Sequence, residues 1–198
     1  MVRRLRYIAV FFIMATIMTG CGFRSTPVTI PGYADKGIRL IAVMPVKAKT
    51  ADPELAKLMR KWILEALYFK GYPRIPVGVI DDTLAKISGK LPDSGADIPP
   101  QAVRTLLNAD AVLYVTLTEC RTATTYLYAA TIISAGFDLR DGKTGETLWK
   151  VQPQNVERNF DITRQRLERT VHQVLEPAIQ EVVEKALRGL PDGPDAIK

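Results

Sequence analysis

Alternating apolar and polar positions predict two long strands in the second half of the chain. Residues 111–118 (AVLYVTLT) are rich in β-branched side chains and follow a turn at residues 108–110. Residues 124–139 form a longer strand with two largely apolar sets of alternating positions. The first set is Tyr126, Tyr128, Ala130 and Ile132, and the second is Leu127, Ala129, Ile133, Ala135 and Phe137. This pattern indicates that both sheet faces are covered or that one face meets another subunit.

A hairpin and two short strands complete the predicted sheet. Residues 141–145 (DGKTG) are typical of a tight loop, and residues 146–151 (ETLWKV) then pair back as a strand. Earlier in the chain, residues 38–46 and 74–77 predict short strands. Prolines at both ends of the second stretch confine it to a sheet edge or a strand end.

Helical spacing of apolar residues predicts four helices. The first begins with Asp52 as N-cap and Pro53 at the first helical position, and it ends at Gly71. The others are residues 79–88, 99–107 and 161–188. Pro177 is expected to kink the last and longest helix.

The order of these elements is β-α-β-α-α-β-β-β-α, which indicates an α/β (α+β) fold. We expect one mixed β-sheet packed by helices, with a long C-terminal helix, as a single domain over residues 38–190. Residues 191–198 (PDGPDAIK) are expected to fray, because they are rich in proline and glycine and end the chain.

The first 21 residues read as an export signal. Arg3, Arg4 and Arg6 make a positive start, and the uncharged, mostly apolar residues 7–18 follow. That run is shorter than the roughly 20 apolar residues that a spanning helix needs, and it fits the hydrophobic region of a signal peptide.

Residues 18–21 (MTGC) resemble the lipobox of bacterial lipoproteins. The resemblance implies cleavage between Gly20 and Cys21, an S-diacylglycerol group on the Cys21 thiol and N-palmitoylation of its new amino group. Several acyl chains hold a protein stably at a membrane, whereas one holds it marginally. Gly22 stands where aspartate is the usual signal for inner-membrane retention, so the resemblance favours the outer membrane.

A tether is expected between the anchor and the domain. Residues 21–37 carry glycine and proline without periodicity, and they could extend about 50 Å at most. Removal of residues 1–20 takes away three arginines and no acid, which lowers the formal net charge from +6 to +3. The remaining excess no longer favours a polyanionic partner such as nucleic acid.

Composition leaves few options for catalysis. The chain has one histidine and two cysteines, which excludes sites with two histidines, Cys₄ zinc sites and a disulfide scaffold. With Cys21 lipidated, a nucleophile pair would have to be Cys120 and His172. Burial of Cys120 and a solvated His172 between Glu168 and Glu176 are the simpler interpretations.

Two other groups of charged residues are candidate sites. A metal would have to bind Asp81, Asp82 or Glu119, but their spacing supports no metal site. The basic residues Arg158, Arg164, Arg166 and Arg169 cluster before and within the start of the last helix, where they could face anionic lipid or a partner.

The second half resembles a family of bacterial lipoproteins of unknown function. The resemblance lies in residues 109–115 (ADAVLYV), 118–119 (TE), 138–149 (DLRDGKTGETLW) and 70–72 (KGY), and spans about residues 38–188. The family's domain is similar in fold to the amino-terminal domain of TolB and to the periplasmic domain of the curli-secretion lipoprotein. The resemblance implies the fold and the anchor, and it carries no catalytic residue.

We therefore expect a non-enzymatic, lipid-anchored lipoprotein on the periplasmic face of the outer membrane, acting in envelope assembly or transport. Its expected partners are the membrane, through the lipid on Cys21, and an envelope protein or a second copy. The expected contact surfaces are the strand at residues 124–139 and the last helix. No cofactor, metal or nucleic acid is expected. The alternative is a periplasmic hydrolase or ligand-binding enzyme that uses Cys120 and His172.

Overall fold

The computed structural model describes residues 27–48, 53–88, 98–125, 128–160 and 163–196, with the backbone alone for residues 164–172. The strands are β1 (Val28–Thr29), β2 (Ile41–Val43), β3 (Lys47–Ala48), β4 (Ala111–Thr125), β5 (Tyr128–Asp141), β6 (Thr147–Val151) and β7 (Gln154–Phe160). The helices are η1 (Ala34–Lys36), α2 (Pro53–Phe69), α3 (Val77–Ser88), α4 (Pro100–Leu107) and α5 (Arg164–Leu187).

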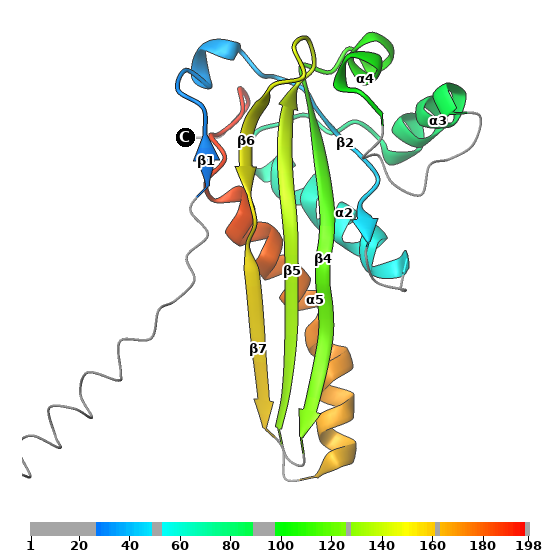
Figure 1. Ribbon diagram of the computed structural model, residues 1–198, viewed down its shortest axis with the longest axis vertical. Helices are drawn as coiled ribbons and strands as arrows, with labels where there is room; N and C mark the ends of the chain where they lie inside the picture. Colours follow the sequence, from blue (N-terminus) through cyan, green and yellow to red (C-terminus); the bar gives the residue numbers. More distant parts are fainter. Residues whose placement is uncertain (1–26, 49–52, 89–97, 126–127, 161–162, 197–198) are drawn as a thin grey trace, which may run out of the picture.

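These strands form one mixed sheet in the order β1-β6-β5-β4-β2, with β3 also on β4 and β7 also on β5 (Figure 1). β2 and β3 run parallel to β4, and the other pairs are antiparallel. The predicted α/β (α+β) class, with a mixed sheet packed by helices and a long C-terminal helix, is confirmed.

The long strands β4 and β5 pair along their whole length. Their register runs from Ala111 beside Asp141 to Thr125 beside Tyr128, with a bulge between Leu117 and Glu119. The prediction that the second strand begins at residue 124 is wrong, because residues 124 and 125 end β4. Apolar and β-branched residues continue across the hairpin connection, so periodicity alone could not locate it.

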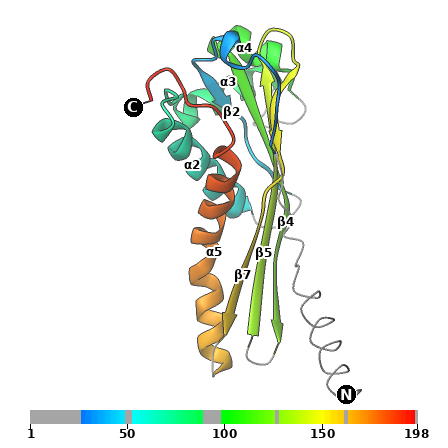
Figure 2. The same ribbon diagram turned by 90° about the vertical axis from the view of Figure 1, so that its left-hand side faces the viewer.

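Helices cover the two faces of the sheet unequally (Figure 2). On one face α2 and α5 pack against the sheet and enclose the larger core. Its largest fully buried members include Met59, Ile63, Leu113, Phe137 and Trp149. On the other face a smaller core lies beneath α3 and α4, with Ala42, Met44, Ile80, Leu84, Val103, Val112 and Tyr114 among its members. Since these β4 residues lie at its start, the second face is covered only at that end.

α2 is the helix that the sequence predicts between Pro53 and Gly71, although its expected N-cap, Asp52, lies outside the described residues. Arg60 is a buried charge within α2, and its guanidinium donates to the Val43 carbonyl (3.2 and 3.0 Å) and to Asp81 (2.7 Å). The carboxylate and the carbonyl together satisfy a cation that would be costly to bury alone. Arg60 therefore joins α2, β2 and α3.

Two of the predicted short strands differ from the structure. Residues 74–77 form no strand, and α3 begins at Val77. Pro73 and Pro76 have no backbone N–H to donate, which disfavours strand pairing there. The predicted strand at residues 38–46 is confined to β2, and β3 follows it after residues 44–46.

The hairpin loop at residues 141–145 is confirmed, and Asp141 organises it. Its carboxylate accepts hydrogen bonds from the backbone N–H groups of Lys143 (2.6 Å) and Thr144 (3.1 Å), and Lys36 lies 3.7 Å away. Burial acts to raise the pKa of Asp141, but these two N–H groups and nearby cations bring it below its ordinary value.

Both ends of the described chain pack onto the domain more than the sequence predicts. Within the predicted tether, β1 pairs with β6 and Tyr33 is buried in the larger core. Beyond the last helix, Tyr72 donates to the Pro191 carbonyl (3.0 Å), and Lys70 pairs with Asp192 (2.6 Å). The described part of the predicted tail, through residue 196, is thus held against the end of α2.

Gly71 should be essential to this docking. Its φ of 84° is unfavourable for other residues, and an added Cβ would meet the backbone of Asp195 and Ala196. We expect Gly71→Ala to lower the free energy of unfolding by about 2 kcal/mol or more, measured by urea denaturation. Gly78→Ala is the control, because Gly78 lies in α3 with open space around its Cα. Equal stability of the two variants would contradict this role.

Candidate interaction surface

The side of β4, β5 and β7 that faces away from α5 is the largest part of the sheet left uncovered by helices (Figures 1 and 2). We call the end of this side that lies away from α3 and α4 the open face. It is defined by nine residues in three rows across the strands. The rows are Arg121–Ile132–Val156, Ala123–Ala130–Arg158 and Thr125–Tyr128–Phe160. Every one of these residues is exposed or half-buried.

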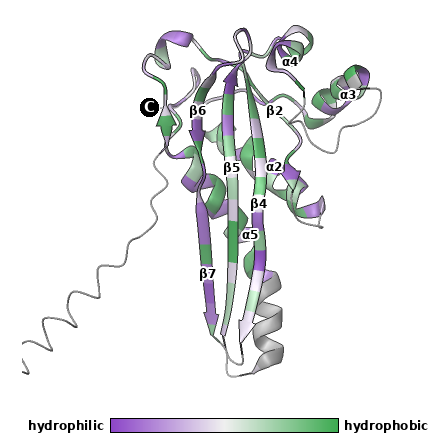
Figure 3. Ribbon diagram, in the orientation of Figure 1, coloured by the Kyte–Doolittle hydropathy of each residue, from purple (hydrophilic) through white to green (hydrophobic). Residues whose placement is uncertain are grey.

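The open face is rich in apolar side chains for a surface in contact with water. Tyr128 and Phe160 form a ring pair, with centroids 4.9 Å apart, and Phe160 is 76% exposed. Ile132 and Val156 lie beside each other two rows away. Figure 3 shows hydrophobic residues along β5 next to the more hydrophilic β7. An exposed group of aromatic and aliphatic residues on a sheet face is typical of a protein contact surface.

Among the described strands, this end of the sheet has two edges without a neighbouring strand. On β4, β2 and β3 occupy the outer edge as far as Leu117, and no other described strand pairs with that edge beyond it. On the other side, β1 pairs with β6, and within the described residues no strand pairs with the outer edge of β7. Residues 119–125 and 154–160 therefore present backbone N–H and C=O groups that another strand can bind.

On the opposite side of β7, a polar cluster attaches α5 to the sheet. Asn155 is 5% exposed; its amide donates to Glu157 and Glu181 (both 2.9 Å), and its carbonyl accepts from Lys185 (2.6 Å). The hydrogen bond from Lys185 is the main reason that the pKa of Glu181 is lowered. These contacts stiffen the sheet behind the open face.

Near the other end of this sheet face, charges are paired with one another. Arg140 binds Asp138 (2.7 Å) and lies over the Tyr114 ring (5.1 Å from its centroid), and Thr147 donates to Asp138 (2.9 Å). The Asp138 hydrogen bonds raise the pKa of Arg140, and burial raises the pKa of Tyr114 to about 12. The Asp138 carboxylate is thus held by Arg140 and Thr147, and the Tyr114 phenol is harder to ionise than a free one.

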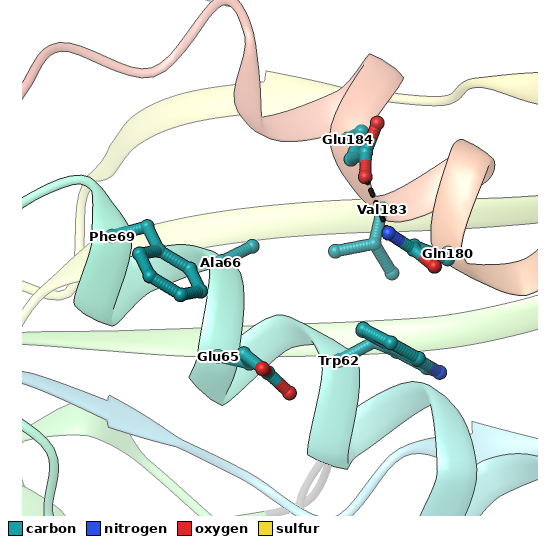
Figure 4. A pocket seen from close by; sticks show the side chains of 7 residues that line it. All are labelled: Trp62, Glu65, Ala66, Phe69, Gln180, Val183 and Glu184. Atoms are coloured by element: carbon teal, nitrogen blue, oxygen red, sulfur yellow. Dashed lines mark hydrogen bonds between the residues drawn. The ribbon is translucent and has the colours of Figure 1, made fainter.

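A shallow groove lies between α2 and α5 (Figure 4). Its lining residues are Trp62, Glu65, Ala66, Phe69, Gln180, Val183 and Glu184, around a volume of about 200 Å³. Gln180 donates to Glu184 (2.8 Å), and Phe69 is 76% exposed. Its polar lining is Glu65, Gln180 and Glu184, and its apolar lining comes from Trp62, Ala66, Phe69 and Val183.

Of the two residues in the enzymatic alternative, the structure describes the side chain of Cys120 and only the backbone of His172. Cys120 lies within β4, where it is half-buried against the larger core. His172 lies in α5, but its side chain is outside the described residues, as are those of Arg164, Arg166 and Arg169. Gly20 and Cys21 precede the described chain. The Cys120–His172 pair and Cys21 lipidation therefore stay predictions.

Two of the three acidic candidates, Asp81 and Glu119, have basic partners, whereas Asp82 lies in α3 without a contact that bears on a metal site. Asp81 binds Arg60, and Glu119 forms an ion pair with Arg121. Among the described residues, no three His, Cys, Asp or Glu side chains are grouped to hold a metal ion. Likewise, no helix in the described ranges has both the length and the hydrophobicity to cross a membrane.

The sequence did not indicate the β7 part of the surface. Residues 154–160 (QNVERNF) lack an apolar alternation, because the side facing α5 carries Asn155, Glu157 and Asn159. The signal that could have revealed it is the unmatched length of the partner strand, since β5 extends well beyond its pairing with β6.

Solved structures share this architecture. Lipoprotein GNA1162 from Neisseria meningitidis is 27% identical over 70% of this chain and 96% of its own, with a TM-score of 0.55. The PelC dodecamer from Paraburkholderia phytofirmans has 15% identity over 88% of this chain and 99% of its own, with a TM-score of 0.54, and shows the same fold. No curated protein matches the chain. The fold thus defines a lipoprotein domain.

The sequence match makes the assignment more specific. Residues 33–189 match the family model described as Putative lipoprotein GNA1162-like. The chain belongs to this family, and the resemblance to a lipoprotein family drawn from its sequence motifs is confirmed.

Replacing Asn155 should loosen α5 from β7. We expect Asn155→Leu to cost about 1–3 kcal/mol, because it removes the buried amide that bridges Glu157, Glu181 and Lys185. Urea denaturation and amide hydrogen exchange in β7 measure the effect. Gln154→Leu is the control. Gln154 is the exposed neighbour of Asn155, so its replacement should change the free energy of unfolding by less than about 0.5 kcal/mol. Unchanged exchange in the Asn155 variant would refute the bridging role.

Proposed function

We propose that this protein is a lipid-anchored lipoprotein on the periplasmic face of the outer membrane. It acts without enzymatic activity, as a protein-interaction component of envelope assembly or transport. The family membership and the MTGC sequence ending at Cys21 support the anchor, and Gly22 favours the outer membrane. The single observation that carries the interaction role is the apolar open face, bounded by two unpaired strand edges.

The anchor would hold the domain close to the membrane. Because β1 begins at Val28, the link from Cys21 to the sheet can span at most about 25 Å. That reach is about half of the extension expected for a tether ending at residue 37. The proposed domain organisation becomes a signal peptide (1–20), a short tether (21–27) and a folded domain from β1 onward.

The partner is an envelope protein or further copies of this chain. PelC, which has the same fold, was solved as a dodecamer, and this supports self-association as one form of the proposed role. A flat face with exposed aromatic residues suits either partner, because both bury apolar area and leave a polar rim.

Replacing the proposed acceptor should release the protein. We expect Cys21→Ala to move the chain from the membrane fraction, or to leave an uncleaved form with residues 1–20 still attached. Membrane fractionation and intact mass measure both outcomes, and Cys120→Ala is the matched control that should stay anchored. A Cys21 variant with unchanged fractionation and mass would disprove the anchor.

Contacts in the cell should concentrate on the open face. A photo-crosslinking residue at Ala130 or Arg158 should give adducts of discrete mass, because these positions lie within the proposed contact. Leu106, 54% exposed on α4, is the control position and should give few. Ile132→Asp, placed in the same face, should reduce the Ala130 adducts. Equal adducts from Leu106, or no effect of Ile132→Asp, would contradict the proposed surface.

A further inference from the structure

We propose that the partner on the β4 edge is a second copy of this chain, which adds its β7 edge in parallel. The contact runs between residues 119–125 of one copy and Gln154–Phe160 of the next. This inference rests on the proposed function, since it specifies how self-association occurs and uses the membrane anchor to orient the copies.

The two edges match in length and in position along the strand direction. Through their common partner β5, Glu119 is level with Gln154, Thr122 with Glu157, and Thr125 with Phe160. Both strands run antiparallel to β5 and therefore point the same way. When the β7 of one copy lies beside the β4 of another in the same orientation, the strands form a parallel pair in register.

The β4 edge lacks the usual protection against strand addition. Its residues 119–125 (ECRTATT) include no proline and no lysine, and three of them are threonines, which favour strands. Residues 121–125 are all exposed. Its two charges, Glu119 and Arg121, pair with each other, so the edge carries no net charge that would repel a strand.

Parallel addition also keeps each sheet face continuous. The odd-numbered residues of this segment lie on the open face, as do Val156, Arg158 and Phe160 of β7. In the level register these sets remain on one side, and the α5 sides of both copies remain on the other. Arg121 then lies beside Val156 and Ala123 beside Arg158, so no like charges are directly opposite.

The position of the anchor distinguishes this arrangement from a two-fold dimer. Val28 is level with Asp138 through Lys150, whereas Thr122 is level with Thr131. An antiparallel β4–β4 pair centred on Thr122 would place the two Val28 residues roughly 46 Å apart along the strands. Parallel addition leaves them at equal height. With the strands standing along the membrane normal, a separation of roughly 46 Å exceeds the roughly 25 Å that one link can span, so copies anchored in that orientation favour the parallel contact.

Repetition of this contact uses both edges of every copy. A head-to-tail interface closes into a ring when the rotation between neighbours allows, and otherwise it propagates as a filament. Anchored copies share one surface, which raises their effective concentration for a contact as narrow as one strand pair.

Engineered cysteines test the contact on the full-length protein in its membrane, with Cys120 replaced by alanine. Ala123→Cys with Arg158→Cys is the diagnostic pair. Within one copy β5 separates these positions by about 9.5 Å, beyond the roughly 7 Å that a disulfide spans. Mild oxidation should therefore give a ladder of dimers, trimers and larger species, more than about tenfold above either single variant. Ala123→Cys with Leu106→Cys is the control and should give none.

The outcomes are decisive for the geometry. A ladder from Ala123→Cys with a cysteine at Arg158, or at Val156 or Phe160 for a shifted register, supports the parallel contact. Dimers from Ala123→Cys alone would indicate a two-fold β4 contact and overturn it. Absence of a ladder from all three pairs would also overturn it.

The same strains separate this inference from the proposed function. If ladders are absent while Ala130 photo-adducts to another envelope protein persist, only the head-to-tail contact fails. If Cys21→Ala leaves fractionation and mass unchanged, the anchor fails whatever the ladder shows. As a further check on the edge, the ladder can be read from Thr125→Cys with Phe160→Cys, a level pair that keeps Arg158. In that background Ala123→Lys should weaken the ladder by placing a second cation beside Arg158, whereas Ala123→Glu should preserve it. Equal effects of the two variants would count against the β4–β7 contact.

Discussion

The antiparallel pairing of β4 and β5 is the constraint on which the rest of the structure depends. It fixes which alternate residues face α2 and α5, and every other strand except β1 aligns directly on one of these two. The two strands extend well beyond the helices α3 and α4, so the pairing that builds the core also creates the open face. Core and candidate surface therefore share one register, and a slip by one residue would exchange them.

Local chemistry explains why much of the fold could be predicted from the sequence. Pro53 and Gly71 mark the ends of α2, and Asp141 forms the hairpin loop, because each acts through its own backbone geometry or a neighbour's N–H. The predictions are wrong where the structure of a segment depends on the strand it pairs with rather than on its own sequence. The β4–β5 connection lies within continuous β-forming sequence, and residues 74–77 have strand-like side chains but too few backbone donors.

The candidate site was harder to predict for a related reason. The apolar face of residues 128–132 is visible in the sequence, but its neighbours on β7 are not, because β7 packs against α5 through Asn155 rather than through apolar residues. A strand that buries a polar residue lacks the apolar alternation by which a strand is predicted, even though hydrogen bonds attach it firmly to the helix. The lipid acceptor shows the opposite case, since Cys21 is recognised from a short motif without any fold.

These features bear on one another through the membrane. An unpaired edge beside an exposed aromatic pair is an aggregation hazard for a freely diffusing protein. A short link to a lipid at Cys21 would keep β1 of each copy within about 25 Å of the membrane, and would disfavour antiparallel encounters that carry one Val28 farther away. The same restriction would promote parallel ones, because it supplies the alignment that a lone strand edge lacks. Anchoring and edge exposure are therefore compatible, because the anchor would align the copies and the exposed edges would give them a surface through which to pair.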